Sequence, residues 1–255
     1  MSTVVTDTRA VFAREMTLVM RDPFSLAFSI VQPLVFLALF GPLLGATVGS
    51  EAFGGESALQ WFLPGVIVML SMFGTTMTGS NLQIEMNTGS YERVLATPLS
   101  RSSLLAGRAL KEFAPLVVQA VLLTVVTVPF GFDLYPVHVL AGLVLLGVFG
   151  IGVGALSYSL ALVTRKNEWV FWMVQQSLLF PLLILSGIML PLESAPGWMK
   201  TASSFNPLTY VVEAERTLFG GTFVDRDVAY GALAAALTCV AGVAIGIRTI
   251  RRSTS

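Results

Sequence analysis

The 255 residues are 55% hydrophobic and only 12% charged, with 15 basic and 15 acidic side chains and a formal net charge of zero. Soluble domains usually carry about 25% charged residues, so this composition argues against a soluble protein. The balanced charge implies no overall positive field that would attract nucleic acid, and we expect no nucleic-acid partner.

The first 22 residues predict a helix that lies on the membrane surface. Over residues 11–21, Phe12, Met16 and Val19 share one helical face and the polar side chains lie on the other. The Asp-Pro pair that follows disfavours a continuous helix. We therefore assign residues 1–22 to a cytoplasmic interfacial helix, with a solvated tail as the alternative.

The remaining chain, residues 23–255, predicts a membrane domain of six helices. Six stretches contain no charged side chain, and each is about as long as the 20 residues that cross a bilayer. The predicted spans are about 24–48, 58–80, 110–130, 137–163, 169–190 and 228–248. The soluble alternative, six buried core helices, would still show polar faces at the helical period. We expect an all-α polytopic membrane protein.

Positive charge is concentrated on one side of the predicted membrane. Twelve of the 15 Lys and Arg residues lie in four segments that share one side of the membrane. These are the segment before the first span, the connections between spans two and three and between spans four and five, and the segment after span six. By the positive-inside rule these segments and both termini are cytoplasmic. We expect a multi-pass protein of the cell (cytoplasmic or inner) membrane, in contact with the lipid bilayer.

The longest segment on the opposite side is residues 193–227. It alternates aromatic residues with prolines, which predicts short outer interfacial helices between spans five and six. We interpret its charged residues Glu213, Glu215 and Arg216 as solvated or mutually paired, with a substrate-gating role as the alternative.

The sequence offers no catalytic or cofactor-binding motif. It contains no G-x-x-x-x-G-K-[ST] phosphate loop, and its one histidine (His138) and one cysteine (Cys239) cannot build a metal site by themselves. We expect no catalytic residue, no metal and no cofactor bound by this chain. The charge-free spans also lack the ionisable groups of ion-driven carriers, so the energy for any transport would come from another protein.

Small and polar residues within the spans predict helix contacts or a solute path. The glycine pairs Gly150/Gly154 and Gly242/Gly246 would allow helices to approach closely. Uncharged polar side chains either bridge helices by hydrogen bonds or line a path for an amphipathic solute. The candidate path residues are Asn81, Gln119, Gln175, Gln176 and Phe180.

Three motifs carry a family resemblance. Residues 88–101, TGSYERVLATPLSR, resemble the cytoplasmic signature of type-2 ABC transporter permeases. Residues 186–198 are similar to that family's turn after the fifth span, and residues 206–214 to its approach to the sixth. Asn87-Thr88 departs from the pattern, because many relatives have a charged residue just before the glycine. The resemblance covers essentially the whole chain, and the subgroup it most resembles is the daunorubicin and multidrug-resistance exporters.

The resemblance implies a permease driven by separate proteins. It would pair with a second permease (a homodimer or a close paralogue) and with two copies of an ABC ATPase that binds ATP and magnesium. The complex would export a hydrophobic or amphipathic compound, such as a drug, an antibiotic or a lipid-like molecule, from the cytoplasm or inner leaflet. The residues expected to couple to the ATPase are Glu85, Met86, Asn87, Gly89, Tyr91, Glu92 and Arg93. Those assigned to an outer gate are Pro191, Trp198, Asn206 and Tyr210.

Local chemistry around the signature independently predicts a short helix between two spans. Gly89 can end the preceding helix, and Ser90 is a candidate N-cap. The helix should stop before Pro98, and Ser100 can cap the next one. The alternative is an ordinary cytoplasmic connector.

Two other functions stay open. One is export of a lipid or lipid-linked glycan by the same family. The other, from a different class, is a non-transporting membrane scaffold or intramembrane enzyme, which reconstituted activity without any ATPase would favour.

Overall fold

The computed structural model describes residues 2–20, 23–47, 57–90, 101–189, 191–192 and 195–253, and these are helices and their connections. The long helices are α1 (Ser2–Met20), α2 (Pro23–Thr47), α3 (Ala58–Asn87), α5 (Arg101–Thr127), α6 (Pro136–Val163), α7 (Glu168–Leu185) and α10 (Arg226–Ser253). The short ones are the 3-10 helix η2 (Val128–Phe130), α8 (Gly197–Ser204) and α9 (Pro207–Phe219). The all-α prediction is confirmed for the described residues.

Within the described residues, five helices are long and apolar enough to cross a membrane: α3, the apolar part of α5 with η2, α6, α7 and α10. The helix α2 adds a shorter apolar stretch, Ile30–Ala46, within a helix of 25 residues. It continues through Pro33 and Pro42, so neither proline ends it. The prediction of a polytopic membrane protein is confirmed, and α2 as a sixth full span stays a prediction.

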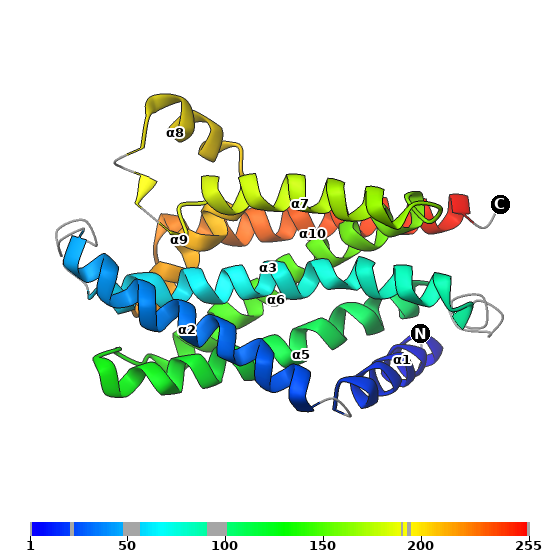
Figure 1. Ribbon diagram of the computed structural model, residues 1–255, viewed down its shortest axis with the longest axis horizontal. Helices are drawn as coiled ribbons and strands as arrows, with labels where there is room; N and C mark the ends of the chain where they lie inside the picture. Colours follow the sequence, from blue (N-terminus) through cyan, green and yellow to red (C-terminus); the bar gives the residue numbers. More distant parts are fainter. Residues whose placement is uncertain are drawn as a thin grey trace.

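The bundle has two distinct ends. Both chain termini lie at one end, which we call the terminal end, and α8 and α9 lie at the other, which we call the α9 end (Figure 1). At the terminal end, α1 packs against α5. Its contact includes the buried side chain of Val11, which faces Gly107. The helix α1 runs from Ser2 to Met20, within the residues 1–22 assigned to an interfacial helix, and its position on the membrane surface stays a prediction.

The helix α6 lies at the centre of the bundle, packed between α3 and α10. Glycines make both crossings close. A Cβ at Gly152 would collide with the α10 backbone at Thr238, and a Cβ at Gly242 would collide with the α6 backbone. On the opposite side of α6, Gly150 and Gly154 face α3. The close helix approach predicted from these small residues is confirmed for Gly150, Gly154 and Gly242.

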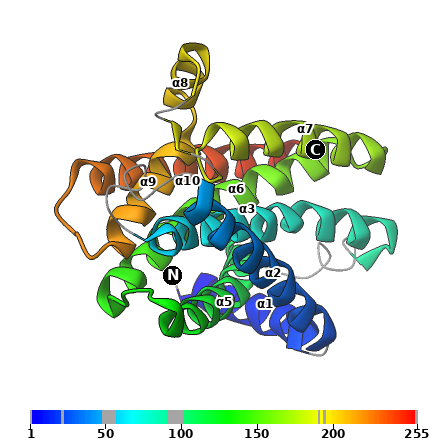
Figure 2. The same cartoon turned by 60° about the vertical axis from the view of Figure 1, so that its left-hand side comes forward.

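The two short helices at the α9 end differ in their packing. Helix α8 stands away from the bundle, and its Trp198 is 70% exposed (Figures 1 and 2). Helix α9, by contrast, packs against α3, α6 and α10 and buries Leu208, Val211 and Leu218. The prediction of short helices in this segment is confirmed, but α9 is part of the core and does not lie on its surface.

Candidate functional site

A cavity of about 780 Å³ lies between α2, α3, α5 and α7. Two amide side chains face it, Gln32 from α2 and Gln119 from α5. The described residues that line it include no charged side chain. Much of the apolar wall consists of four phenylalanines: Phe36, Phe40, Phe73 and Phe180. The cavity can therefore receive a mostly apolar molecule that carries a few hydrogen-bonding groups.

The structure brings two of the predicted path residues to this cavity, Gln119 and Phe180. Gln32 also lines this cavity. In the sequence it was simply one more amide within a charge-free stretch. Which face of a helix borders a cavity depends on tertiary packing, so composition could not single out Gln32.

The other predicted path residues do not line the cavity. Gln175 is buried, and its Oε1 accepts a hydrogen bond from the Ser157 hydroxyl of α6 (3.1 Å). Its neighbour Gln176 is exposed on α7, and Asn81 is half-buried on α3. In this conformation Gln175 serves as a helix-bridging amide, one of the two roles that the sequence allowed.

A second cavity, of about 590 Å³, lies on another face of α2. It is bounded by α2, the start of α3 and the region where α5 meets η2. Its lining is apolar apart from Thr127, whose hydroxyl donates to the Thr124 carbonyl oxygen (2.8 Å). The helix α2 therefore has open space on two of its faces.

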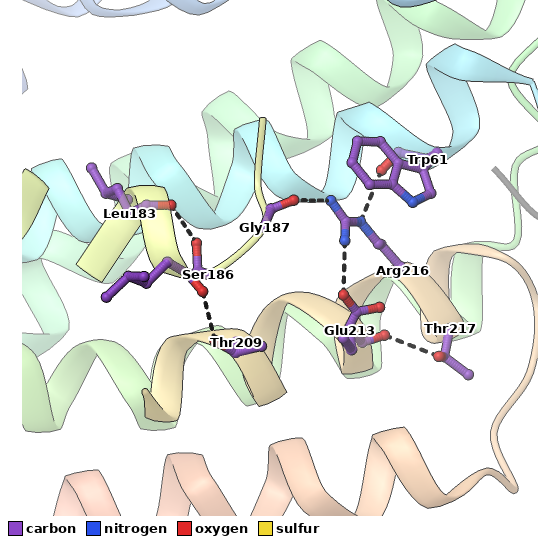
Figure 3. Close-up of polar contacts among 9 residues, drawn as sticks. Trp61, Leu183, Ser186, Gly187, Thr209, Glu213, Arg216 and Thr217 are labelled. Carbon is purple, nitrogen blue, oxygen red and sulfur yellow. Dashed lines mark hydrogen bonds and ion pairs between the residues drawn. The ribbon is translucent and has the colours of Figure 1, made fainter. Parts of the chain in front are cut away.

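At the α9 end, Arg216 joins three elements in an arrangement that we call the Arg216 clamp (Figure 3). Its Nη1 donates to Glu213 Oε1 (2.9 Å), its Nη2 to the Gly187 carbonyl oxygen (2.8 Å), and its Nε to the Trp61 carbonyl oxygen (3.3 Å). The guanidinium carbon also lies 3.6 Å from the centroid of the Trp61 ring. Arg216 is only 9% exposed. The interpretation of Arg216 and Glu213 as a mutual pair, one of the two that the sequence allowed, is confirmed.

The local backbone explains how the clamp forms. Gly187 follows α7 with a positive φ of 74°, a conformation that glycine adopts readily and that ends the helix. The turn directs the Gly187 carbonyl oxygen toward α9 (Figure 3). Glu213 and Arg216 are three residues apart on α9, the spacing at which helical side chains meet.

Two more hydrogen bonds tie the start of α9 to the end of α7. The Asn206 amide donates to the Leu182 carbonyl oxygen (2.8 Å), and the Thr209 hydroxyl donates to the Leu185 carbonyl oxygen (3.2 Å). Asn206 also caps α9, because its Oδ1 accepts from the Leu208 N–H (3.1 Å). One buried asparagine thus satisfies backbone groups on two helices.

Gln60 forms a further junction in the first turn of α3. Its Nε2 donates to the carbonyl oxygens of Phe219 (2.8 Å) and Asp133 (3.3 Å), and its Oε1 accepts from the Asp133 N–H (3.0 Å). These bonds join α3 to the end of α9 and to the connection that precedes α6. Sequence reasoning missed Gln60, and the only signal was an amide near the end of a charge-free stretch.

The four residues predicted for an outer gate all lie at the α9 end, in different environments. Asn206 is buried, as described above. Tyr210 is half-buried, and its hydroxyl donates to the Ser204 carbonyl oxygen (2.7 Å). Pro191 is half-buried in the connection before α8, and Trp198 is exposed on α8.

Glu215 contradicts the interpretation of the outer charges as solvated or paired. The side chain is fully buried, and neither carboxyl oxygen has a hydrogen-bond partner within the described part of the chain. Its carboxyl group lies against Gly142 of α6 and the ring of Phe219. This burial raises the pKa of Glu215 from 4.5 to about 8. Arg216, the adjacent residue, points toward α3, because successive helical residues differ in direction by about 100°.

At the terminal end, Glu85, Met86 and Asn87 form the last turn of α3. Gly89 has a positive φ of 68°, so the predicted helix end at this glycine is confirmed. The remaining residues of the predicted coupling group, together with the helix expected to follow, lie outside the described residues: Tyr91, Glu92 and Arg93.

Polar contacts link this end of α3 to the turn between α6 and α7. The Asn87 amide donates to Glu168 Oε2 at the start of α7 (3.2 Å). One turn earlier, Gln83 Nε2 donates to the Ala161 carbonyl oxygen and to the Thr164 hydroxyl (both 3.1 Å). A displacement of the end of α3 would therefore act directly on α7, which borders the large cavity.

Comparison with known proteins places these features among membrane transporters. Residues 6–219 match the family described as ABC-2 type transporter. The chain is 31% identical to the daunorubicin resistance ABC transporter permease protein DrrB1 of Streptomyces coeruleorubidus, over 89% of this chain and 80% of that protein. It is 30% identical to the putative transport permease ycf38 of Cyanophora paradoxa, over 78% and 69% of the two chains. It is 26% identical to the probable doxorubicin resistance ABC transporter permease protein DrrC of Mycobacterium tuberculosis, over 92% and 84%.

Proposed function

Because this chain belongs to the ABC-2 type transporter family and is a membrane permease, we propose that it exports a hydrophobic or amphipathic compound out of the cytoplasm or the inner leaflet. Drugs, antibiotics and lipid-like molecules are of this chemical kind. The names of two relatives refer to daunorubicin and doxorubicin resistance, which supports such a substrate.

The observation that carries this proposal is the cavity between α2, α3, α5 and α7. Its volume of about 780 Å³ falls within the range of small-molecule sites, roughly 300–1,000 Å³. The amides of Gln32 and Gln119 offer hydrogen bonds, while the rest of the wall is apolar. A strongly charged compound would lose its hydration there without gaining a counter-charge, which is costly.

The proposal includes the partners that would supply energy. Two copies of an ABC ATPase would bind at the terminal end, which the distribution of basic residues favours as cytoplasmic together with both termini. A second permease, identical or closely related, would complete the path. The coupling residues would be Glu85, Met86, Asn87, Gly89, Tyr91, Glu92 and Arg93.

At the opposite end, α9 and its contacts would form the outer gate. The gate would include four residues of this region: Pro191, Trp198, Asn206 and Tyr210. The Arg216 clamp supports an outer gate here because it joins the starts or ends of three helices. With the clamp formed, the α9 end would be closed. Opening would require the Arg216 contacts to Trp61 and Gly187 to break together.

Substitution of Glu92 by Arg tests the coupling assignment. In the complex with the ATPase, E92R should keep its membrane insertion but hydrolyse ATP without transport, because the reversed charge disrupts the contact between the subunits. D227R reverses a charge at the α9 end and should leave hydrolysis and transport coupled. Normal transport by E92R would exclude the assignment.

Stimulation of ATP hydrolysis in the reconstituted complex tests the substrate class. Daunorubicin should raise both hydrolysis and drug transport, whereas a labelled phospholipid and a lipid-linked oligosaccharide should not. Response to the lipid or the oligosaccharide alone would instead favour the lipid or glycan exporter. The apolar 590 Å³ cavity beside α2 is the observation that supports a lipid as the second candidate substrate. Activity without any ATPase would favour a scaffold or an intramembrane enzyme.

A further inference from the structure

Glu215 occupies a niche that the fold builds for its carboxyl group. The side chain has no solvent exposure, and it projects from α9 toward α6. It meets α6 at Gly142, where any added Cβ would collide with Oε2. The ring of Phe219, one turn further along α9, lies against the same site. A glycine at this one position of α6 thus leaves the space that the carboxyl group fills.

Among the described residues, no charged group compensates Glu215 in this niche. Neither of its oxygens has a hydrogen-bond partner within the described part of the chain. On α9 itself, Arg216 pairs with Glu213 and points toward α3, which presents the uncharged Gln60 and Trp61. On α6, the imidazole of His138 stacks on Phe223, with ring centroids 3.9 Å apart.

The other helices that pack on α9 keep their titratable groups away from this niche. On α8, α9 and α10 these groups make other contacts or are exposed: Lys200, Tyr210, Arg226, Asp227 and Tyr230. On α3 and α7 the described acidic groups, Glu85 and Glu168, lie at the terminal end. Burial alone is therefore the cause of the pKa of about 8 at Glu215.

The chemistry of the niche selects a proton as the ligand. Calcium and magnesium need about six oxygen ligands and zinc about four ligands, and here a single carboxyl group lies against an aromatic ring and a glycine backbone. We propose that Glu215 is a proton-binding site that holds a proton while α9 packs against α6 and releases it to water when α9 moves away. In the release step the O–H bond breaks, the electron pair stays on the carboxylate, and water at the α9 end accepts the proton.

Proton release would make the opening of the α9 end sensitive to pH, a consequence that rests on the proposed exporter function. The packed conformation keeps the proton at neutral pH because burial holds the pKa near 8. Once hydrated, the carboxyl group returns to a pKa near its ordinary value of 4.5. Between these two values each rise of one pH unit should favour the open conformation by up to about tenfold.

Infrared difference spectroscopy on the full-length permease, without ATPase or substrate, tests the proton site. At about pH 6.5 ordinary carboxyl groups are ionised, so the carbonyl band of a protonated acid should be visible and should come from Glu215. E215Q should remove this band, and D227N, which removes an exposed carboxylate at the same end, should keep it. A wild-type spectrum without the band, or a band that persists in E215Q, would overturn the proposal. The wild-type spectrum tests the proposal even where E215Q does not fold, because a spectrum without the band overturns it.

A second measurement separates the proton site from its coupling to transport. In the reconstituted complex, the transport rate should rise as the solution at the α9 end is made more alkaline, and E215Q should abolish this dependence. Identical pH profiles of the two proteins would overturn the coupling. The infrared band would still establish the site, and transport by both proteins would leave the exporter function intact.

Discussion

Arg216 contacts Trp61 in two ways at once: its guanidinium lies 3.6 Å from the centre of the indole ring, and its Nε donates to the carbonyl oxygen of the same residue (3.3 Å). The ring supplies a cation–π contact, and the carbonyl oxygen supplies a charge-assisted hydrogen bond. A single arginine therefore holds both the side chain and the backbone of the first turn of α3.

Replacement of Arg216 by lysine should destabilise the permease by about 2–3 kcal/mol. The single ammonium group of lysine cannot donate in three directions while stacking on Trp61, so buried carbonyl oxygens lose their donors. Thermal unfolding of the purified chain measures the effect. R226K changes an exposed arginine at the same end and should stay within about 0.5 kcal/mol of the wild type. Equal melting temperatures for the two variants would argue against the clamp.

The crossing of α6 and α10 should not tolerate a side chain at Gly152. In G152A the new Cβ would collide with the backbone of Thr238, which cannot move aside as a flexible side chain can. We expect a loss of about 1–3 kcal/mol, measured by thermal unfolding. In the matched variant G74A the Cβ has open space, and alanine should stabilise the helix by up to about 1 kcal/mol. Similar losses in both variants would exclude the close crossing as the cause.

Substrate affinity should depend on Gln119 and not on Gln176. Q119L removes an amide that faces the large cavity, and loss of one hydrogen bond of about 1 kcal/mol weakens binding roughly fivefold. The concentration of daunorubicin that half-maximally stimulates ATP hydrolysis measures this effect. Gln176 is exposed and lies outside that cavity, so Q176L should leave the concentration unchanged. If Q176L raised this concentration and Q119L did not, the substrate would bind outside the 780 Å³ cavity.

Folding stability should decline with pH because of Glu215. The folded pKa of about 8 exceeds the ordinary value of 4.5, so the folded chain binds the proton more tightly than the unfolded chain. Protonated Glu215 makes its full contribution to the free energy of unfolding below about pH 4.5. Between pH 4.5 and pH 8 this contribution falls by up to about 1.4 kcal/mol per pH unit. Thermal unfolding over this range should show the decline in the wild type and in D227N but not in E215Q. A parallel decline in E215Q would assign it to another group.

Charge placement and hydropathy predicted most of the membrane bundle. The predicted span 137–163 corresponds to α6, Pro136–Val163, because uncharged stretches of this length are what a bilayer requires. The predicted span 58–80 lies within α3, which continues to Asn87. Hydropathy marks where the apolar surface ends, and a helix can extend into water with polar residues.

The burial of α9 could not be predicted in the same way. Three charged residues in four positions, Glu213, Glu215 and Arg216, indicate a solvated helix by composition. The fold instead supplies partners for Arg216 on α3 and after α7, and a niche for Glu215 on α6. These partners are far apart in the sequence, so only the tertiary structure brings them together.

The path residues show a similar limit. Gln175 and Gln176 looked equivalent in the sequence, but a helical step of about 100° turns one inward and the other outward. Gln119 and Phe180 come from different helices and border one cavity only after α5 and α7 have packed around α2 and α3. The sequence could suggest which residue types suit a solute path. Which of these residues border the cavity depends on how each helix is oriented in the bundle.

The hydrogen bonds of Gln60 determine where the bundle is stiff. They fasten α3, the end of α9 and the connection before α6 to one another, so these parts should respond to a mechanical load as a single block. Within the described part of the chain, two faces of α2 border open space, the cavities of about 590 and 780 Å³. A load applied at the terminal end should therefore deflect α2 first, and the most compliant wall of the permease should be the one beside the 780 Å³ cavity.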